Sequence, residues 1–126
     1  MAEHIPHLLG GGPILSPAAT AAVTGGQVVE ITGNFTVGPA GAASIKACGV
    51  AGRDAAIGAA TPVFTDGVHD LVASGAITAG DRVVCAAAGK VATVGAGTAF
   101  TIIGIALEGA ADAAKLRVRL GGPGLG

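Results

Sequence analysis

Aromatic side chains are nearly missing from this sequence. Its 126 residues include no tryptophan, no tyrosine and three phenylalanines, whereas 23 are glycine. A core without aromatics depends on small side chains, and each buried CH₂ group contributes only roughly 0.8 kcal/mol. Each glycine also loses more backbone entropy on folding than any other residue. A monomer of this composition is expected to be marginally stable, and packing against other copies or a larger assembly would offset the deficit.

An excess of charge of either sign is also lacking. Seven Lys and Arg face eight Asp and Glu, so the formal net charge is −1. This balance gives no strong field for nucleic acid or acidic lipid, and neither is expected as a partner. The two cysteines, Cys48 and Cys85, have no metal-ligand spacing. We interpret them as small buried thiols in a reducing compartment, with no metal or other cofactor.

Long uninterrupted apolar runs are missing as well. The N-terminus has no charged segment followed by an apolar run, so no secretory signal is predicted. Residues 91–107 carry no charge, but this stretch is at the lower limit of length for a bilayer span. Gly95, Gly97 and several threonines interrupt it and favour two strands over one helix. No membrane span is expected.

Proline and glycine divide off the N-terminal segment, residues 1–20. Pro6, Pro13, Pro17 and the glycines at 10–12 exclude a helix or a central strand there. The segment is nevertheless too apolar for a solvated tail. We therefore predict an extended arm, with at most one short edge strand, that needs the surface of a partner or of a neighbouring subunit to lie on. Its expected contact residues are Ile5, Leu8, Leu9, Ile14 and Leu15.

Residues 21–120 are predicted to form one β domain, and residues 121–126 a flexible Gly-rich tail. Short β-branched segments alternate with Gly, Asn and Asp turns about every eight to twelve residues, which is typical of an all-β sandwich or barrel. Residues 66–67 (Asp-Gly) predict a hairpin, and residues 52–60 a small-residue connection with room for one helical turn. The predicted strands are residues 28–32, 35–37, 45–51, 62–65, 68–72, 83–86, 90–94, 101–107 and 115–120.

The chain is organised around residues 73–84, a glycine-punctuated turn that leads into a strand. Gly75 and Gly80 can adopt positive φ, and the Asp81 side chain can close the turn. A weaker version occurs at residues 22–29. Three pairs of residues share one and the same sequence separation, which predicts two pseudo-repeated halves packed into one closed or nearly closed sheet. The pairs are Val28 with Val83, Gly49 with Gly104, and Val63 with Val118.

Candidates for chemistry are few. His69 adjoins Asp70 and follows Asp66, but no nucleophile with a matching third group accompanies them, so a structural histidine is favoured. Lys90 resembles in position the hairpin lysine of biotinyl and lipoyl carrier domains, without the acidic or Met-flanked context of that family. The alternation in residues 115–120 places three basic residues on one face, without aromatic stacking partners. We interpret this row as solvated or interfacial.

Several segments resemble the small capsid decoration (cement) proteins of tailed bacteriophages, a family also labelled DUF2190. The resemblance covers roughly residues 18–120, with its segments in the same order. It is carried by residues 67–83 (GVHDLVASGAITAGDRV), 22–29 (AVTGGQVV), 89–91 (GKV), 103–107 (IGIAL) and 118–120 (VRL).

The resemblance implies a non-enzymatic protein, made in the bacterial host cytoplasm, that binds the outside of the expanded phage head and reinforces it. The implied partners are the major capsid protein and other copies of the chain, commonly in a homotrimer. The family supplies no catalytic residue to carry over. Two alternatives stay open: another structural virion protein, such as a head-fibre or tail component, and a β carrier or ligand-binding module that uses Lys90.

Overall fold

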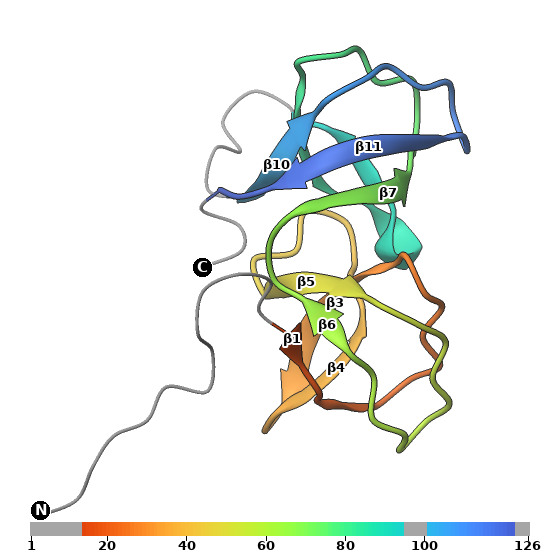
Figure 1. The fold of residues 1–126 in the computed structure, drawn as a ribbon, viewed down its shortest axis with the longest axis vertical. Coiled ribbons are helices and arrows are strands. Elements are labelled where there is room, and N and C mark those ends of the chain that lie inside the picture. The colour runs from red at the N-terminus through yellow and green to blue at the C-terminus, as the bar shows by residue number, and fades with distance from the viewer. Residues whose placement is uncertain (1–13, 95–100, 123–126) are drawn as a thin grey trace, which may run out of the picture.

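The computed structural model describes residues 14–94 and 101–122, except for the side chain of Ile14. In these residues the chain forms two sheets and one single-turn 3₁₀ helix, η1 (Ala87–Gly89). The predicted all-β class is confirmed. Figure 1 shows two lobes stacked along the long axis, one built from β1–β6 and the other from β7–β11. The described residues contain no helix of the length and apolar character that a bilayer crossing requires.

The first lobe is a six-stranded sheet with strand order β1-β6-β5-β3-β4-β2. All neighbouring pairs are antiparallel except β2 with β4. Its strands are β1 (Ile14–Leu15), β2 (Ala18–Ala19), β3 (Val28–Gly33), β4 (Thr36–Pro39), β5 (Ala47–Ala51) and β6 (Val63–Phe64).

The second lobe is a five-stranded sheet with strand order β7-β11-β10-β8-β9. All of its neighbouring pairs are antiparallel. Its strands are β7 (Val68–Val72), β8 (Arg82–Cys85), β9 (Val91–Thr93), β10 (Ile102–Ala106) and β11 (Lys115–Leu120).

Each sheet closes on itself because its first segment pairs at both edges. In the first lobe, β1 pairs with β6, and shortly afterwards Ala19 of β2 pairs in parallel with Val37. In the second lobe, β7 pairs with β11, and Ala73 just beyond it bridges in parallel to Val91. We call the two closed sheets the first and the second barrel. Closure leaves few unpaired strand edges.

The two barrels repeat the same plan. The strand orders match when β1, β6, β5, β3 and β4 are aligned with β7, β11, β10, β8 and β9. Gly49 is the counterpart of Gly104, and Val63 of Val118, as predicted. Val28, however, corresponds to Arg82 rather than Val83, since Val28 lies opposite Val50 and Arg82 opposite Ile105. Residues of β3 are therefore one position closer in sequence to their counterparts in β8 than residues of β5 are to their counterparts in β10. The halves also form two closed sheets, not one.

The glycine-punctuated turns at residues 73–84 and 22–29 are confirmed as matching features. The Asp81 Oδ2 atom accepts a hydrogen bond of 3.0 Å from the Thr78 N–H, and the Gln27 Oε1 atom accepts one of 2.8 Å from the Thr24 N–H. Gly26 and Gly80, directly before these acceptors, hold φ values of 92° and 90°. Each turn therefore needs a glycine followed by a side chain that can accept a hydrogen bond.

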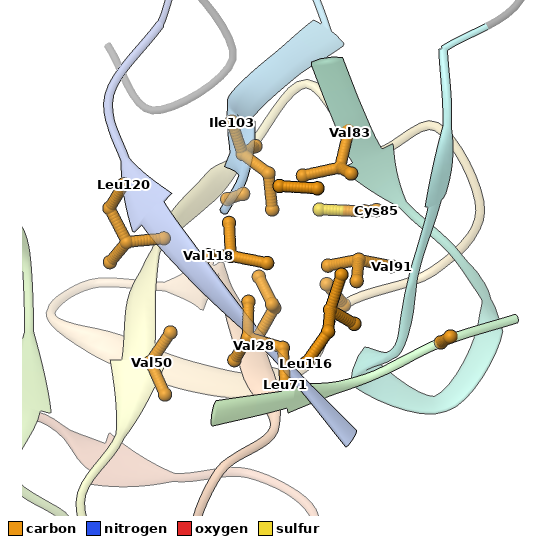
Figure 2. Close-up of a cluster of buried hydrophobic side chains, with 14 of the residues drawn as sticks. Val28, Val50, Leu71, Val83, Cys85, Val91, Ile103, Leu116, Val118 and Leu120 are labelled. Carbon is orange, nitrogen blue, oxygen red and sulfur yellow. The ribbon is translucent and has the colours of Figure 1, made fainter. Parts of the chain in front are cut away.

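Two clusters of small apolar side chains fill the barrels. The cluster of the first barrel consists of Ala19, Val23, Val29, Val37, Ala51, Ala55 and Val63. The cluster of the second barrel includes Leu71, Ala73, Ile77, Val83, Cys85, Val91, Ile103, Ala106, Leu116, Val118 and Leu120. The second cluster extends into the first lobe, whose outward-facing residues Val28, Ala40, Ala47 and Val50 belong to it. Figure 2 shows Val28 beside Leu116 and Leu71.

Hydrogen bonds join the lobes along the same contact. The Gly89 N–H donates to the Ala40 carbonyl oxygen at 3.0 Å, and the Ala43 N–H donates to the Cys85 carbonyl oxygen at 2.8 Å. A Cβ added to Gly89 would lie 2.7 Å from the Cβ of Gln27, so only glycine allows this approach. We call this packing of the turn after β8 on the outer face of the first barrel the interlobe contact.

Three local predictions need correction. Asp66 and Gly67 do not close a hairpin: β6 pairs with β1 and β5, whereas β7 pairs with β11, so these two residues link the barrels. Gly67 does hold a positive φ of 94°, but the buried faces of Val63 and Leu71 decide which sheet each strand joins. Residues 52–60 contain no helical turn, and residues 14–19 supply two short strands instead of at most one.

Candidate functional surfaces

The predicted arm residues are only partly within the described structure. Ile5, Leu8 and Leu9 lie outside it. Ile14 lies in β1 opposite Phe64, and Leu15 opposite Val63. The Leu15 side chain is half-buried and packs against the core of its own barrel. A role of Ile5, Leu8, Leu9, Ile14 and Leu15 in contacting another protein stays a prediction.

His69 makes structural contacts. Its Nε2 atom lies 2.8 Å from the Asp66 carbonyl oxygen, across the link between the barrels. Its ring packs against Phe64 with the centroids 5.5 Å apart and the planes tilted by 32°. The described residues hold no group of three or more His, Cys, Asp or Glu side chains placed to bind a metal ion. The histidine thus stabilises the link at residues 66–67 and packs it against Phe64 in the last strand of the first barrel.

Lys90 is exposed at the end of η1, beside a groove of about 290 Å³ between the barrels. Lys115 and Asp70 also line this groove, together with the backbone of Gly25 and Gly26. The N–H groups of both glycines are already engaged, with Asp54 Oδ1 and the Ala51 carbonyl oxygen respectively. The groove therefore offers two lysine side chains, with no free amide from these two glycines to hold an anion.

The basic row of β11 has the predicted alternation. Leu116, Val118 and Leu120 are buried, whereas the three basic side chains that alternate with them, Lys115, Arg117 and Arg119, are exposed. The row lies between β7 and β10, with Arg117 opposite Asp70 and Arg119 opposite Val68 and Ile105. Asp70 therefore partly balances the positive charge of Arg117 at the centre of the row, whereas Arg119 lies beside an apolar hollow.

That hollow, on the outer face of the second barrel, was not predicted from the sequence. It encloses about 300 Å³ and contains the half-buried side chains of Ile102 and Ile105. We call it the Ile105 hollow. Its lining residues are Arg82, Ile102, Gly104, Ile105, Arg119, Leu120, Gly121 and Gly122.

Exposed apolar side chains gather at one end of the first barrel, and this patch was not predicted from the sequence either. Ile31, at 40% exposure, lies in β3, and Phe35, at 61%, lies in the turn that follows. Phe35 holds a φ of 53°, an uncommon conformation for a bulky residue. We call residues 31–35 the Phe35 turn. A turn between the predicted strands 28–32 and 35–37 is present, but its residues are Asn34 and Phe35, and Gly33 is the last residue of β3. An aromatic residue directly after Gly33-Asn34 was the available signal for an exposed apolar tip.

Both cysteines are free thiols. Burial raises the pKa of the Cys48 thiol from its ordinary value of 9.0 to about 11. Burial, with a smaller effect from the nearby Glu30 carboxylate, raises the pKa of Cys85 to about 11 as well. Both thiols therefore stay protonated at neutral pH, and nucleophilic chemistry would be slow because the thiolate is the reactive form.

Comparisons with known proteins agree with this description. A search of curated proteins finds no match to the sequence. Among solved structures, the fold resembles the head fiber gp8.5 N base of bacteriophage phi29 with a TM-score of 0.70 and 18% sequence identity. The alignment covers 88% of this chain and 95% of that one, and at this identity it shows a shared fold. The sequence profile of the phage cement proteins matches residues 12–121, which include both barrels. The chain therefore belongs to the phage cement protein family, whose members are structural proteins of the virion associated with the capsid.

Proposed function

We propose that the chain is a decoration protein that binds the outer surface of the expanded phage head, stabilises the shell and catalyses no reaction. The observation that carries this proposal is the match of the cement family over residues 12–121. The proposed partners are the major capsid protein and further copies of the chain, in a homotrimer.

The physical basis is linkage. A protein that binds the expanded lattice, and not the dissociated capsid subunits, stabilises that lattice by mass action. Contacts with two or more neighbouring capsid subunits add avidity, because the second contact forms at a high effective concentration. The two barrels are joined through a shared core, which supports a rigid bridge between such neighbours.

The N-terminal segment is the proposed capsid-contacting or subunit-contacting arm. The predicted contact residues before β1 are Ile5, Leu8 and Leu9. The segment leads into Ile14 and Leu15 at the edge of the first barrel, so an arm that binds a neighbour is anchored on a paired strand. Binding must exceed the several kcal/mol that ordering such a segment costs.

Co-sedimentation tests the proposal. Purified protein is mixed with expanded heads that lack decoration, with unexpanded heads as the control, and pelleted heads are assayed for bound protein. Saturable binding to expanded heads, together with greater resistance of the decorated shell to heat, is the expected result. An absence of binding to expanded heads over the micromolar range would refute the proposal.

A head-fibre component is the second candidate, favoured by the structural similarity to the phi29 head fiber base. Heat resistance separates the two candidates. A cement protein is expected to raise the disruption temperature of the shell as it saturates its sites, since shell stability is linked to binding. A fibre base that contacts a single capsid subunit would bind the dissociated subunit equally well and would therefore leave the disruption temperature unchanged. An intact mass equal to the chain mass would argue against the carrier module, because a carrier bears a covalent adduct, here on Lys90.

A further inference from the structure

The interlobe contact uses one surface from each barrel, and among the residues that the structure describes the two counterpart surfaces stay uncovered. On the second barrel, the contact is made by the turn after β8, through Cys85 and Gly89. On the first barrel, it is made by the outer face of β3 and β5, where Val28, Ala47 and Val50 are covered. Since the barrels repeat one plan, the first barrel has its own version of the turn, and the second barrel has its own version of the outer face.

The free counterpart of the turn is the Phe35 turn. Cys85 pairs with Val91 in the second barrel as Ile31 pairs with Val37 in the first, so Ile31 is the counterpart of Cys85 and Phe35 that of Gly89. Cys85 is buried in the cluster of the second barrel, with its carbonyl oxygen in the interlobe contact, and Gly89 is buried there too, whereas Ile31 is 40% and Phe35 61% exposed. The same place in the repeat is thus covered in one barrel and uncovered, with apolar side chains, in the other.

The free counterpart of the outer face is the Ile105 hollow. The registers place Arg82, Ile102 and Ile105 where the first barrel has Val28, Ala47 and Val50. The three residues of the first barrel are at most 5% exposed because the second barrel packs on them. In the second barrel the same place is a hollow of about 300 Å³ whose lining includes two half-buried isoleucines.

We propose that a second copy of this chain fills the Ile105 hollow with its Phe35 turn, so that copies associate head to tail through a contact that repeats the interlobe contact. The choice of occupant follows from continuity: the same face of the first barrel is already covered by a turn of the same design within each chain.

The residue types on the two surfaces are complementary. The interlobe contact seats a glycine closely against Gln27 and Val28, whereas the intermolecular contact offers a phenylalanine to a hollow. Arg82 and Arg119 border the hollow, and an arginine guanidinium packs well on an aromatic face. The stems of both arginines add apolar surface around the ring. Phe35 is larger than Gly89, its counterpart in the interlobe contact, and the Ile105 hollow correspondingly offers more room than the covered face of the first barrel.

Such a contact is heterologous, because the two surfaces differ. Heterologous contacts close into a ring when the rotation between copies allows it, and otherwise continue as a filament. The inference rests on the self-association in the proposed function and is independent of head binding. The inference is therefore tested in solution without heads. If the copies do not associate there, the inference fails, and head binding is still tested separately by co-sedimentation.

Complementation between two variants tests the interface. Phe35→Asp removes the turn surface and keeps the hollow, whereas Ile105→Asp removes the hollow and keeps the turn. Sedimentation velocity is expected to show self-association for the wild type and a loss of at least about thirty-fold in affinity for each variant alone. An equimolar mixture is expected to form a 1:1 pair and nothing larger, since it contains one intact combination of surfaces.

Ile57→Asp is the matched control, because Ile57 is 73% exposed and belongs to neither surface. It should self-associate like the wild type. If circular dichroism shows that Ile105→Asp does not fold, Arg82→Glu replaces it, since Arg82 is exposed at the rim of the hollow.

Three results would overturn the inference. The first is a wild type that stays monomeric into the millimolar range. The second is a mixture of folded variants that forms no 1:1 pair. The third is assembly that survives Phe35→Asp and is lost when residues 1–13 are removed, which would assign the contact to the N-terminal segment.

Discussion

Gly49 and Gly104 occupy the same place in the two barrels, each pressed against the last strand of its sheet. A Cβ on Gly49 would come within 3.0 Å of both the Phe64 carbonyl oxygen and the Val63 side chain. A Cβ on Gly104 would lie 2.5 Å from the Arg119 carbonyl oxygen and 2.9 Å from the Val118 side chain. Each glycine also adjoins an irregularity in the pairing with β3 or β8. The repeat therefore includes one close backbone contact as well as the strand order.

Replacing either glycine with alanine should destabilise the protein by about 1–3 kcal/mol, since the added methyl group meets backbone that cannot move without breaking strand pairs. Gly49→Ala and Gly104→Ala should have similar effects. Gly41→Ala is the control, because no atom lies within 4 Å of its added Cβ and Gly41 has no positive φ. Urea unfolding measures the difference. An unchanged midpoint for both core variants would contradict the assigned close contacts.

Val28 should couple the stability of the two barrels. It is fully buried and belongs to the cluster of the second barrel although it lies in a strand of the first. Val28→Ala is expected to lower the free energy of unfolding by about 1.5–3 kcal/mol while the chain still unfolds in one transition. Val68→Ala, at a side chain that is 52% exposed, should change it by less than about 0.5 kcal/mol. Separate transitions for the two barrels would show that the shared cluster does not couple them.

Stability should fall as the pH rises from about 9 to about 11. The folded chain holds the thiol protons of Cys48 and Cys85 up to a pKa of about 11, whereas the ordinary value is 9.0. Between these values the unfolded chain binds fewer protons, so unfolding becomes more favourable with rising pH. The contribution of the thiols is fully present below pH 9 and is lost through pH 11.

Thermal unfolding across this pH range measures the effect, and the chain has no tyrosine to titrate there. The double variant C48A/C85A should lose part of the pH dependence. At pH 7.5, the thiols of the folded protein should react with a disulfide reagent much more slowly than those of the protein in urea. Equal rates in both conditions would show that burial does not hold the protons.

Local sequence signals predicted the elements better than their partners. The turns at residues 73–84 and 22–29 were predictable because glycine followed by a hydrogen-bond acceptor specifies them within a short stretch of chain. The alternation of β11 was predictable for the same reason, since a buried face and a solvated face leave a period of two. Asp66-Gly67 specified a change of direction correctly, but the pairing of β6 and β7 depends on which core Val63 and Leu71 enter.

The candidate surfaces were less predictable than the fold. The Ile105 hollow exists because no described residue covers this side of β10, whereas in the other barrel the counterpart strand is covered. No local pattern distinguishes the two cases, because Val50 and Ile105 are both apolar strand residues. The single-position shift in the correspondence of β3 with β8 could likewise not be predicted from the sequence, since Val28 and Val29 match Val83 equally well by residue type.

The N-terminal segment can be separated from the barrel that it adjoins. A chain that begins at Ile14 retains β1 and β2, and with them the pairing that closes the first barrel. It also retains the half-buried Leu15 and the buried Ala19. We therefore expect its free energy of unfolding to stay within about 0.5 kcal/mol of the full chain. A chain that begins at Thr20 loses both strands and should unfold, because the first barrel is then open on both edges.

Binding to heads should reveal the role of the N-terminal segment separately from the effect of truncation on folding. If Ile5, Leu8 and Leu9 contact the capsid or a neighbouring subunit, the chain that begins at Ile14 should bind expanded heads at least about tenfold more weakly although it is folded. A full-length variant with serine at these three positions should show the same loss, which excludes an effect of chain length alone. Co-sedimentation gives the affinity and circular dichroism the fold. A truncated chain that is folded and binds heads as tightly as the full chain would show that the segment makes no contribution, and capsid contacts would then be sought on the barrels.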